Sequence, residues 1–148
     1  DNHGGSFENF WADFRSRVAF TKPGDHTLLN DWCMAACYSA DPDGTVRLPF
    51  DPATGERIPE VWARWLAHDP VYMARTPDYG RALKSMRAIY IDAGKRDEYF
   101  LDLGAEAFHR ELLKLGIDDH FFELFDATHA SIEYRYPKAL AYLAPRIT

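Results

Sequence analysis

Apolar side chains recur at helical spacing through the first part of the chain. The aromatic residues between positions 7 and 14 fall at i, i+3, i+4 and i+7, which places them on one face of a helix. Ser6 precedes this stripe and is a favoured N-cap residue, because its side chain can accept a backbone N–H of the first turn. A second helix is expected from Asp25 or Thr27 to about Tyr38. It has so many apolar positions that more than one of its faces should be buried.

Loops rich in Pro, Gly and Asp separate these helices from the ones that follow. The stretch 41–44 (DPDG) is a strong turn signal, and an irregular segment with two further prolines continues to Gly55. Pro59 and Pro77 each suit the first turn of a further short helix, because the proline ring already holds a helical φ angle. The pattern therefore predicts a mainly helical region over residues 1–84.

Residues 85–148 have a different pattern, in which strand and helix alternate. The segment 88–93 (AIYIDA) is short, mostly apolar and followed by a glycine, as is typical of a strand buried on both faces. A helical stripe comes next, then a second strand-like run at 120–125 (HFFELF), and a last helix from about Pro137. Strand, helix and strand in this order form a βαβ unit with parallel strands and a right-handed crossover, so the fold class is α/β.

Two strands are too few for a parallel sheet that stands alone. One further extended piece, at Thr45 to Leu48, is doubtful as a strand. Parallel sheets are normally covered on both faces and contain more than two strands. Either the helices before residue 85 bury the two-stranded ribbon, or further strands lie upstream of Asp1.

Two polar loops follow the two predicted strands. GKRDE (94–98) and DATH (126–129) should lie at the carboxyl ends of neighbouring strands, where open α/β sheets bind their ligands. Asp97 and His129 therefore emerge at the same edge. A hydroxyl nucleophile needs a His to take its proton, and that His needs a carboxylate to fix its tautomer and stabilise the imidazolium. The order of acid, then His, matches the last two members of a hydrolase triad whose Ser comes first.

Each of these two residues also has a structural interpretation. Asp97 is well placed to cap the helix that begins near Tyr99. His129 alone is compatible with a solvated loop histidine or a histidine that donates a hydrogen bond in the core. The residue pattern leaves both interpretations open.

The second part of the chain resembles a known family. Residues 86–118 and 122–145 resemble the C-terminal part of α/β-hydrolase esterases, the relatives of esterase D and enterochelin esterase. The Gly-x-x-Asp from Gly94 to Asp97 resembles the catalytic-acid loop of that family, and Thr128-His129 resembles its catalytic-His loop. The resemblance implies that Asp97 orients His129, which acts as general base and then as general acid.

The helical region before the first strand looks like the cap that this family inserts between its nucleophile strands and its acid strand. The resemblance implies a partial α/β-hydrolase fold, with a cap over 1–84 and a C-terminal βαβα portion of the core over 85–148. In such a cap, the aromatic stripe would pack as core or line an acyl pocket. The intact protein would be a serine esterase that cleaves a small-molecule carboxylic ester without a cofactor.

The sequence departs from the family at the nucleophile. It contains no Gly-x-Ser-x-Gly pentapeptide. Ser6 follows His-Gly-Gly, as in the oxyanion loop of lipases, but its position before an apolar stripe fits a helix cap. We therefore expect this chain to be the C-terminal half of an esterase, inactive alone, whose partner is an N-terminal remainder or a second copy.

The two cysteines, Cys33 and Cys37, are one helical turn apart. No further Cys or His joins them at zinc-ligand spacing, so we expect them in the core. A Cys nucleophile with His129 as its base is conceivable, but a cysteine in an apolar helix is usually inert.

Two other groups of polar residues do not match the ligand patterns of known metal sites. His109 and His120 with the acidic pair at 118–119 match no ligand motif, so we expect them on the solvated surface. The DPDG turn at 41–44 resembles the start of a calcium loop, but Pro52 stands where the twelfth-position Glu is required.

Composition and charge exclude some classes of binding partner. The chain has 148 residues, of which 47% are hydrophobic and 15% aromatic, as in a folded domain. Its 17 Lys and Arg against 23 Asp and Glu give a net charge of −6, without the basic footprint of a nucleic-acid binder. No apolar run approaches the roughly 20 residues of a membrane span, and a cytoplasmic location is expected.

Two alternatives to the esterase assign different roles to the same residues. In a non-enzymatic helical binding or assembly module, the aromatic helices contact a partner, and Asp97 and His129 are structural. In an acyltransferase on the same scaffold, the pair catalyses transfer to an acceptor other than water.

Overall fold

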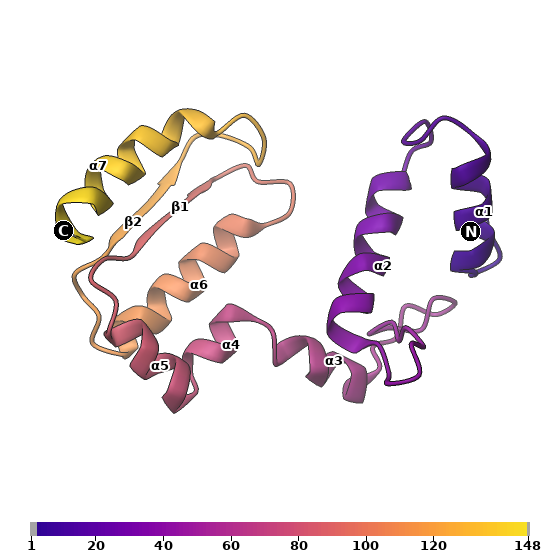
Figure 1. The fold of residues 1–148 in the computed structure, drawn as a ribbon, viewed down its shortest axis with the longest axis horizontal. Helices are drawn as coiled ribbons and strands as arrows, with labels where there is room; N and C mark the ends of the chain where they lie inside the picture. Colours follow the sequence, from indigo (N-terminus) through magenta and orange to yellow (C-terminus); the bar gives the residue numbers. More distant parts are fainter. Residues whose placement is uncertain (1–2, 148) are drawn as a thin grey trace. The chain divides into compact units, whose positions relative to one another are not determined.

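The computed structural model describes residues 3–147. They form two compact units that divide after His68. Figure 1 labels the helices and strands of each unit. Within the described residues, no helix combines the length and the apolar character that crossing a bilayer requires.

Over residues 3–68, the first unit contains the helices α1 (Phe7–Ser16), α2 (Asp25–Ser39) and α3 (Pro59–Leu66). Ser6 caps α1 as predicted, since its Oγ accepts the Asn9 N–H at 3.2 Å. Pro59 lies in the first turn of α3, also as predicted.

The segment between α2 and α3 is a loop with two isolated antiparallel bridges, Ala40 with Val46 and Phe50 with Arg57. The doubtful extended piece at 45–48 is therefore a bridge and not a strand. In the DPDG turn, the Asp43 carboxylate accepts the Thr45 N–H at 2.9 Å, which stabilises the turn locally.

Aromatic rings form the core of the first unit. Phe10 and Phe14 on α1 are buried, and Phe7 stacks on Trp32 of α2 with ring centroids 3.9 Å apart.

The prediction that more than one face of α2 is buried is wrong. Its buried residues are Asp25, Ala35 and Ser39, whereas Leu28, Cys33 and Cys37 are exposed. The expectation of core cysteines fails for the same reason: both lie on the part of α2 that is exposed to solvent.

The second unit contains α4 (Pro70–Ala74), α5 (Pro77–Lys84), β1 (Tyr90–Gly94), α6 (Leu101–Lys114), β2 (Phe121–Phe125), the short 3-10 helix η1 (Glu133–Arg135) and α7 (Tyr136–Ile147). The two strands are parallel, with Tyr90 opposite Phe121 and Gly94 opposite Phe125. Figure 1 shows them side by side, flanked by α6 and α7. The predicted βαβ unit is confirmed, and the unit is α/β in the coarse sense of helices packed with parallel strands.

The strands are less buried than the sequence pattern predicts. Only Ala93, Gly94 and Phe125 are buried, and the other strand residues are half-buried. Within residues 3–147, each strand has a hydrogen-bonded neighbour on one edge only. A two-stranded ribbon therefore cannot reach the burial of a central parallel strand.

The division between the units lies after His68, whereas the sequence pattern predicts a boundary after residue 84. The reason is the packing of α4 on α6, where Ala74 and Leu112 are both buried. Arg75 also pairs with Glu111 of α6 at 3.1 Å. The helices α4 and α5 therefore belong with the strands.

Candidate active site

Asp97 and His129 are in direct contact. The two residues lie in the loops that follow β1 and β2, at adjacent carboxyl ends of the parallel strands. Asp97 Oδ2 is 3.1 Å from His129 Nδ1, which is hydrogen-bonding distance. The structure thus brings together the two side chains that the sequence pattern places at the same edge.

Backbone contacts fix the two loops to each other. The Lys95 N–H donates to the Phe125 carbonyl at 2.8 Å, and the Arg96 N–H donates to the Ala127 carbonyl at 3.0 Å. A Cβ at Gly94 would lie only 2.4 Å from the Ala127 carbonyl oxygen. The close approach of the loops therefore requires glycine at this position.

Asp97 uses its two carboxylate oxygens for different purposes. Oδ1 accepts the Tyr99 N–H at 2.8 Å, and Oδ2 faces His129. The carboxylate is buried, with 4% of the side chain exposed. Burial opposes ionisation, but the hydrogen bonds from the Tyr99 N–H and the His129 ring outweigh it, and the pKa of Asp97 is lowered. The carboxylate is therefore charged at neutral pH.

The structural interpretation of Asp97 is correct in part. Its bond to the Tyr99 N–H stabilises the turn that leads into α6. However, the N-cap position of α6 is Phe100, which has a left-handed φ of 60°. This conformation is strained for a residue with a Cβ, and such strain often accompanies functional loops.

His129 is held at three points. Its ring meets Asp97, its backbone N–H donates to Glu98 Oε2 at 3.1 Å, and its ring packs edge-on against Tyr99 with centroids 4.9 Å apart. The Glu98 backbone N–H and the His129 N–H both lower the pKa of Glu98. The side chain of His129 is 45% exposed, and Nε2 has no hydrogen-bond partner within residues 3–147.

Glu98 and Tyr99 are further residues of the site that the sequence pattern does not indicate. They follow Asp97 directly, but nothing in the sequence pattern indicates that either would contact His129, which is 31 positions from Glu98 and 30 from Tyr99. The parallel pairing of the strands produces these contacts.

An ion-pair network anchors the chain on the far side of the His129 loop. Arg135 of η1 bonds Asp92 of β1 at 2.9 Å and also pairs with Glu123 of β2. Its guanidinium lies over the Phe125 ring, 4.3 Å from the centroid. Burial, together with a bond to Asp92, raises the pKa of Tyr90 to about 12. The loop that carries His129 is thus attached to the strands at both ends.

The serines of this unit do not complete the pair. Ser85 donates to the Ala82 carbonyl at the end of α5. Ser131 follows His129 closely, with a left-handed φ of 59°, but within the described chain it has no hydrogen bond to His129.

His109 and His120, which the sequence pattern places on the solvated surface, are half-buried and contact each other. His109 Nδ1 and His120 Nε2 are 2.6 Å apart, and the His109 ring stacks on Phe122 with centroids 4.1 Å apart. Burial of the His109 ring lowers its pKa, and electrostatic repulsion from His120 lowers it further. Residues 3–147 contain no cluster of three His, Cys, Asp or Glu side chains suited to a metal ion.

Comparisons with other proteins add no family assignment. No protein-family model matches the chain, and no curated protein matches it either. The geometry around Asp97 and His129 is therefore the observation on which a function can be argued.

Proposed function

We propose that this chain is the C-terminal part of a serine carboxylic-ester hydrolase and supplies the acid and the base of a Ser-His-Asp triad. Asp97 is the acid and His129 the base. The observation that carries the proposal is the 3.1 Å contact between Asp97 Oδ2 and His129 Nδ1 at neighbouring strand ends. A buried, ionised carboxylate on one side of the ring and a free Nε2 on the other are what a general base of this kind needs.

The roles follow from the hydrogen bonds of the pair. His129 donates its Nδ1–H to Asp97, so the Nε2 lone pair is available to take the proton of a serine hydroxyl. The serine oxygen then attacks the ester carbonyl, and the imidazolium returns the proton to the leaving alkoxide, which departs as the alcohol. In the second half, His129 takes a proton from water, the hydroxide attacks the acyl-serine, and the proton returns to serine as the carboxylic acid leaves.

The nucleophile belongs to a part of the enzyme outside these 148 residues, since the sequence has no nucleophile elbow. Two features of the second unit support the proposal that the intact enzyme has further strands beside β1 or β2. In the part of the chain that the structure describes, the sheet of this unit has two parallel strands, and a sheet of this size is rarely stable alone. Large apolar side chains of the same unit are also exposed: Phe100, Leu103, Tyr134, Tyr136 and Leu140.

Hydrolysis of p-nitrophenyl butyrate tests the proposal. The native protein that contains these residues should cleave the ester, and His129→Ala should lower its kcat/KM at least about 1,000-fold. The 148-residue chain alone should show no hydrolysis that depends on His129, because it lacks the nucleophile.

Two results would contradict this assignment. One is a native protein whose esterase activity is unchanged by His129→Ala. The other is His129-dependent hydrolysis by the isolated 148-residue chain, which would require a nucleophile within it. His109→Ala is the matched control, because it removes an imidazole from the same unit outside the site and should leave kcat/KM unchanged.

A further inference from the structure

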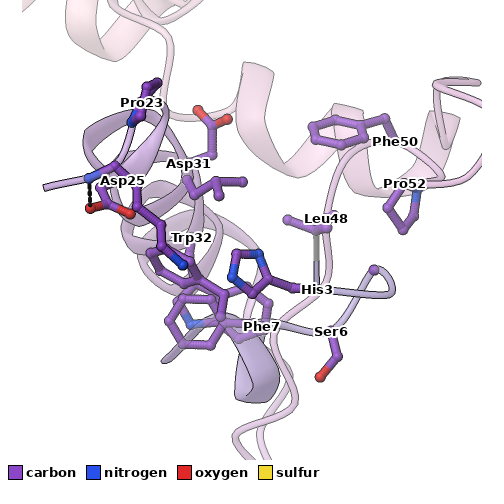
Figure 2. A pocket seen from close by; sticks show the side chains of 14 residues that line it. His3, Ser6, Phe7, Pro23, Asp25, Asp31, Trp32, Leu48, Phe50 and Pro52 are labelled. Carbon is purple, nitrogen blue, oxygen red and sulfur yellow. Dashed lines mark hydrogen bonds between the residues drawn. The ribbon is translucent and has the colours of Figure 1, made fainter. Parts of the chain in front are cut away.

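The first unit contains a pocket of about 540 Å³, shown in Figure 2. Its walls come from the segment before α1, from α1, from the segment between α1 and α2, from α2 and from the loop after α2. A volume in this range suits a small organic molecule. All the lining residues belong to one compact unit, so the pocket is a property of that unit.

Aromatic and aliphatic side chains make up most of the wall. Phe7 and Trp32 stack with parallel rings, and Phe10 packs against Phe7 with centroids 5.6 Å apart. Phe50 and Leu48 come from the loop after α2 (Figure 2). The aromatic faces offer a surface for an apolar body, and also for a cation, which the negative face of an aromatic ring attracts.

Two of the charged groups in the wall are already neutralised within the unit. Asp25 accepts two hydrogen bonds from the Arg17 guanidinium, each 2.7 Å long. Lys22 Nζ bonds both carboxylate oxygens of Asp13, at 2.8 and 2.9 Å. Neither group is therefore the primary charge that a ligand would meet.

Asp31 is different, because it lines the pocket without a partner of its own. It is half-buried on the same face of α2 as Leu28 and Trp32, and within residues 3–147 it has no ion pair or hydrogen bond. Partial burial disfavours the charged form of this carboxyl and raises its pKa. A cation in the pocket would compensate the carboxylate at this point.

We propose that this pocket binds an organic cation that carries an aromatic or branched apolar body, with Asp31 as the counter-ion. The ammonium group pairs with the Asp31 carboxylate, and the apolar body packs against Phe7, Trp32 and Phe50. This site lies wholly in the first unit and does not depend on the esterase assignment of Asp97 and His129.

Three probes of nearly equal size and different charge test the site. The full chain is titrated at pH 7 with 2-phenylethylamine, 2-phenylethanol and 3-phenylpropionate, with affinity measured by calorimetry and by the shift of the Trp32 indole N–H signal. We expect the amine to bind at least about 10-fold more tightly than the alcohol, because a charge-assisted hydrogen bond forms only with the amine. The propionate should bind most weakly.

Asp31→Asn should remove the preference for the amine and leave the affinity for the alcohol unchanged, which also shows that the pocket is intact. Asp119→Asn is the matched control, because Asp119 is an exposed carboxylate in the other unit and its loss changes the net charge equally. The control should keep the preference. An amine that binds no more tightly than the alcohol, a preference that survives Asp31→Asn, or no binding of any probe up to about 10 mM would overturn the proposal.

Discussion

At the scale of single residues, Asp97 combines a structural and a chemical contact. One carboxylate oxygen holds the turn before α6 through the Tyr99 N–H, and the other holds the His129 ring. Because one side chain makes both contacts, it fixes the position of the imidazole ring relative to the backbone of the loop that carries Asp97. The turn before α6 and the contact with His129 therefore depend on the same carboxylate.

Replacing Asp97 with Asn removes the charge and keeps the shape. We expect Asp97→Asn to lower the free energy of unfolding by about 1 kcal/mol at pH 7, because bonds to a charged acceptor are the stronger ones. The folded-state pKa of Asp97 is lowered. Its ionised form therefore stabilises the fold above the unfolded pKa of about 3.9, and this stability is lost as the pH falls through the lower folded pKa.

Urea unfolding of both proteins, from pH 7 down to about pH 2, measures this difference. The gap in free energy should shrink as the solution becomes acidic. A gap that stays constant or widens in acid would show that the charge of Asp97 does not stabilise the fold.

Gly94 determines how closely the two loops can approach. The Cβ of Gly94→Ala would lie 2.4 Å from the Ala127 carbonyl oxygen, a backbone atom that cannot move alone. We expect a loss of about 3 kcal/mol in the free energy of unfolding, with the loops pushed apart. Chemical denaturation measures the loss.

Gly104→Ala is the matched control for this substitution. Gly104 lies inside α6, and an added Cβ there meets nothing within 4 Å. We expect a gain of about 0.5–1 kcal/mol, since alanine is the better helix former. Equal effects of the two substitutions would contradict the close approach at Gly94.

At the scale of elements, η1 and β1 are connected by a network of ionised side chains. Arg135 lies between Asp92 and Glu123, with 14% of its side chain exposed. Removing the guanidinium would leave Asp92 without its ion-pair partner, whereas Glu123 would keep its pair with Lys138. The segment that follows the His129 loop would then lose its attachment to the strands.

Arg135→Met tests this attachment. We expect the free energy of unfolding to fall by about 2 kcal/mol, because a mostly buried pair loses one partner. Arg96→Met is the control: its pair with Asp126 is exposed, so its loss should cost less than about 1 kcal/mol. Thermal or urea unfolding compares the two, and a larger loss for Arg96→Met would contradict the role of the network.

The sequence pattern predicts the βαβ unit well and the small helices less well. The switch from helical to strand-like spacing near residue 85 identifies β1, α6 and β2 within a few positions. The pattern does not indicate α4, because its five residues are too few to show a periodicity. The burial of α2 was overestimated because apolar composition does not say which faces meet a neighbour.

The pairing of Asp97 with His129 was predictable from topology. Neighbouring parallel strands end at the same edge, so their loops must be close. The contacts of Glu98 and Arg135 were not predictable, since their partners are 31 and 43 positions away in the sequence. Such contacts depend on side-chain directions that only the folded chain fixes.

At the scale of the whole molecule, each unit has its own candidate site. The first unit contains the pocket with Asp31, and the second contains the Asp97–His129 pair and a parallel ribbon with few strands. A binding or assembly module is the main rival to the esterase. It predicts that Asp97 and His129 contribute only to folding, and that no serine reacts with an ester-like probe.

A fluorophosphonate probe tests the esterase assignment most directly, because it reacts covalently with the activated serine of such enzymes. The native protein is labelled, its intact mass is recorded, and the modified residue is mapped by peptide sequencing. We predict an adduct on a serine outside the 148 residues, in a species heavier than 17.0 kDa, which disappears in His129→Ala. No adduct, or an adduct that persists in His129→Ala, would contradict the account.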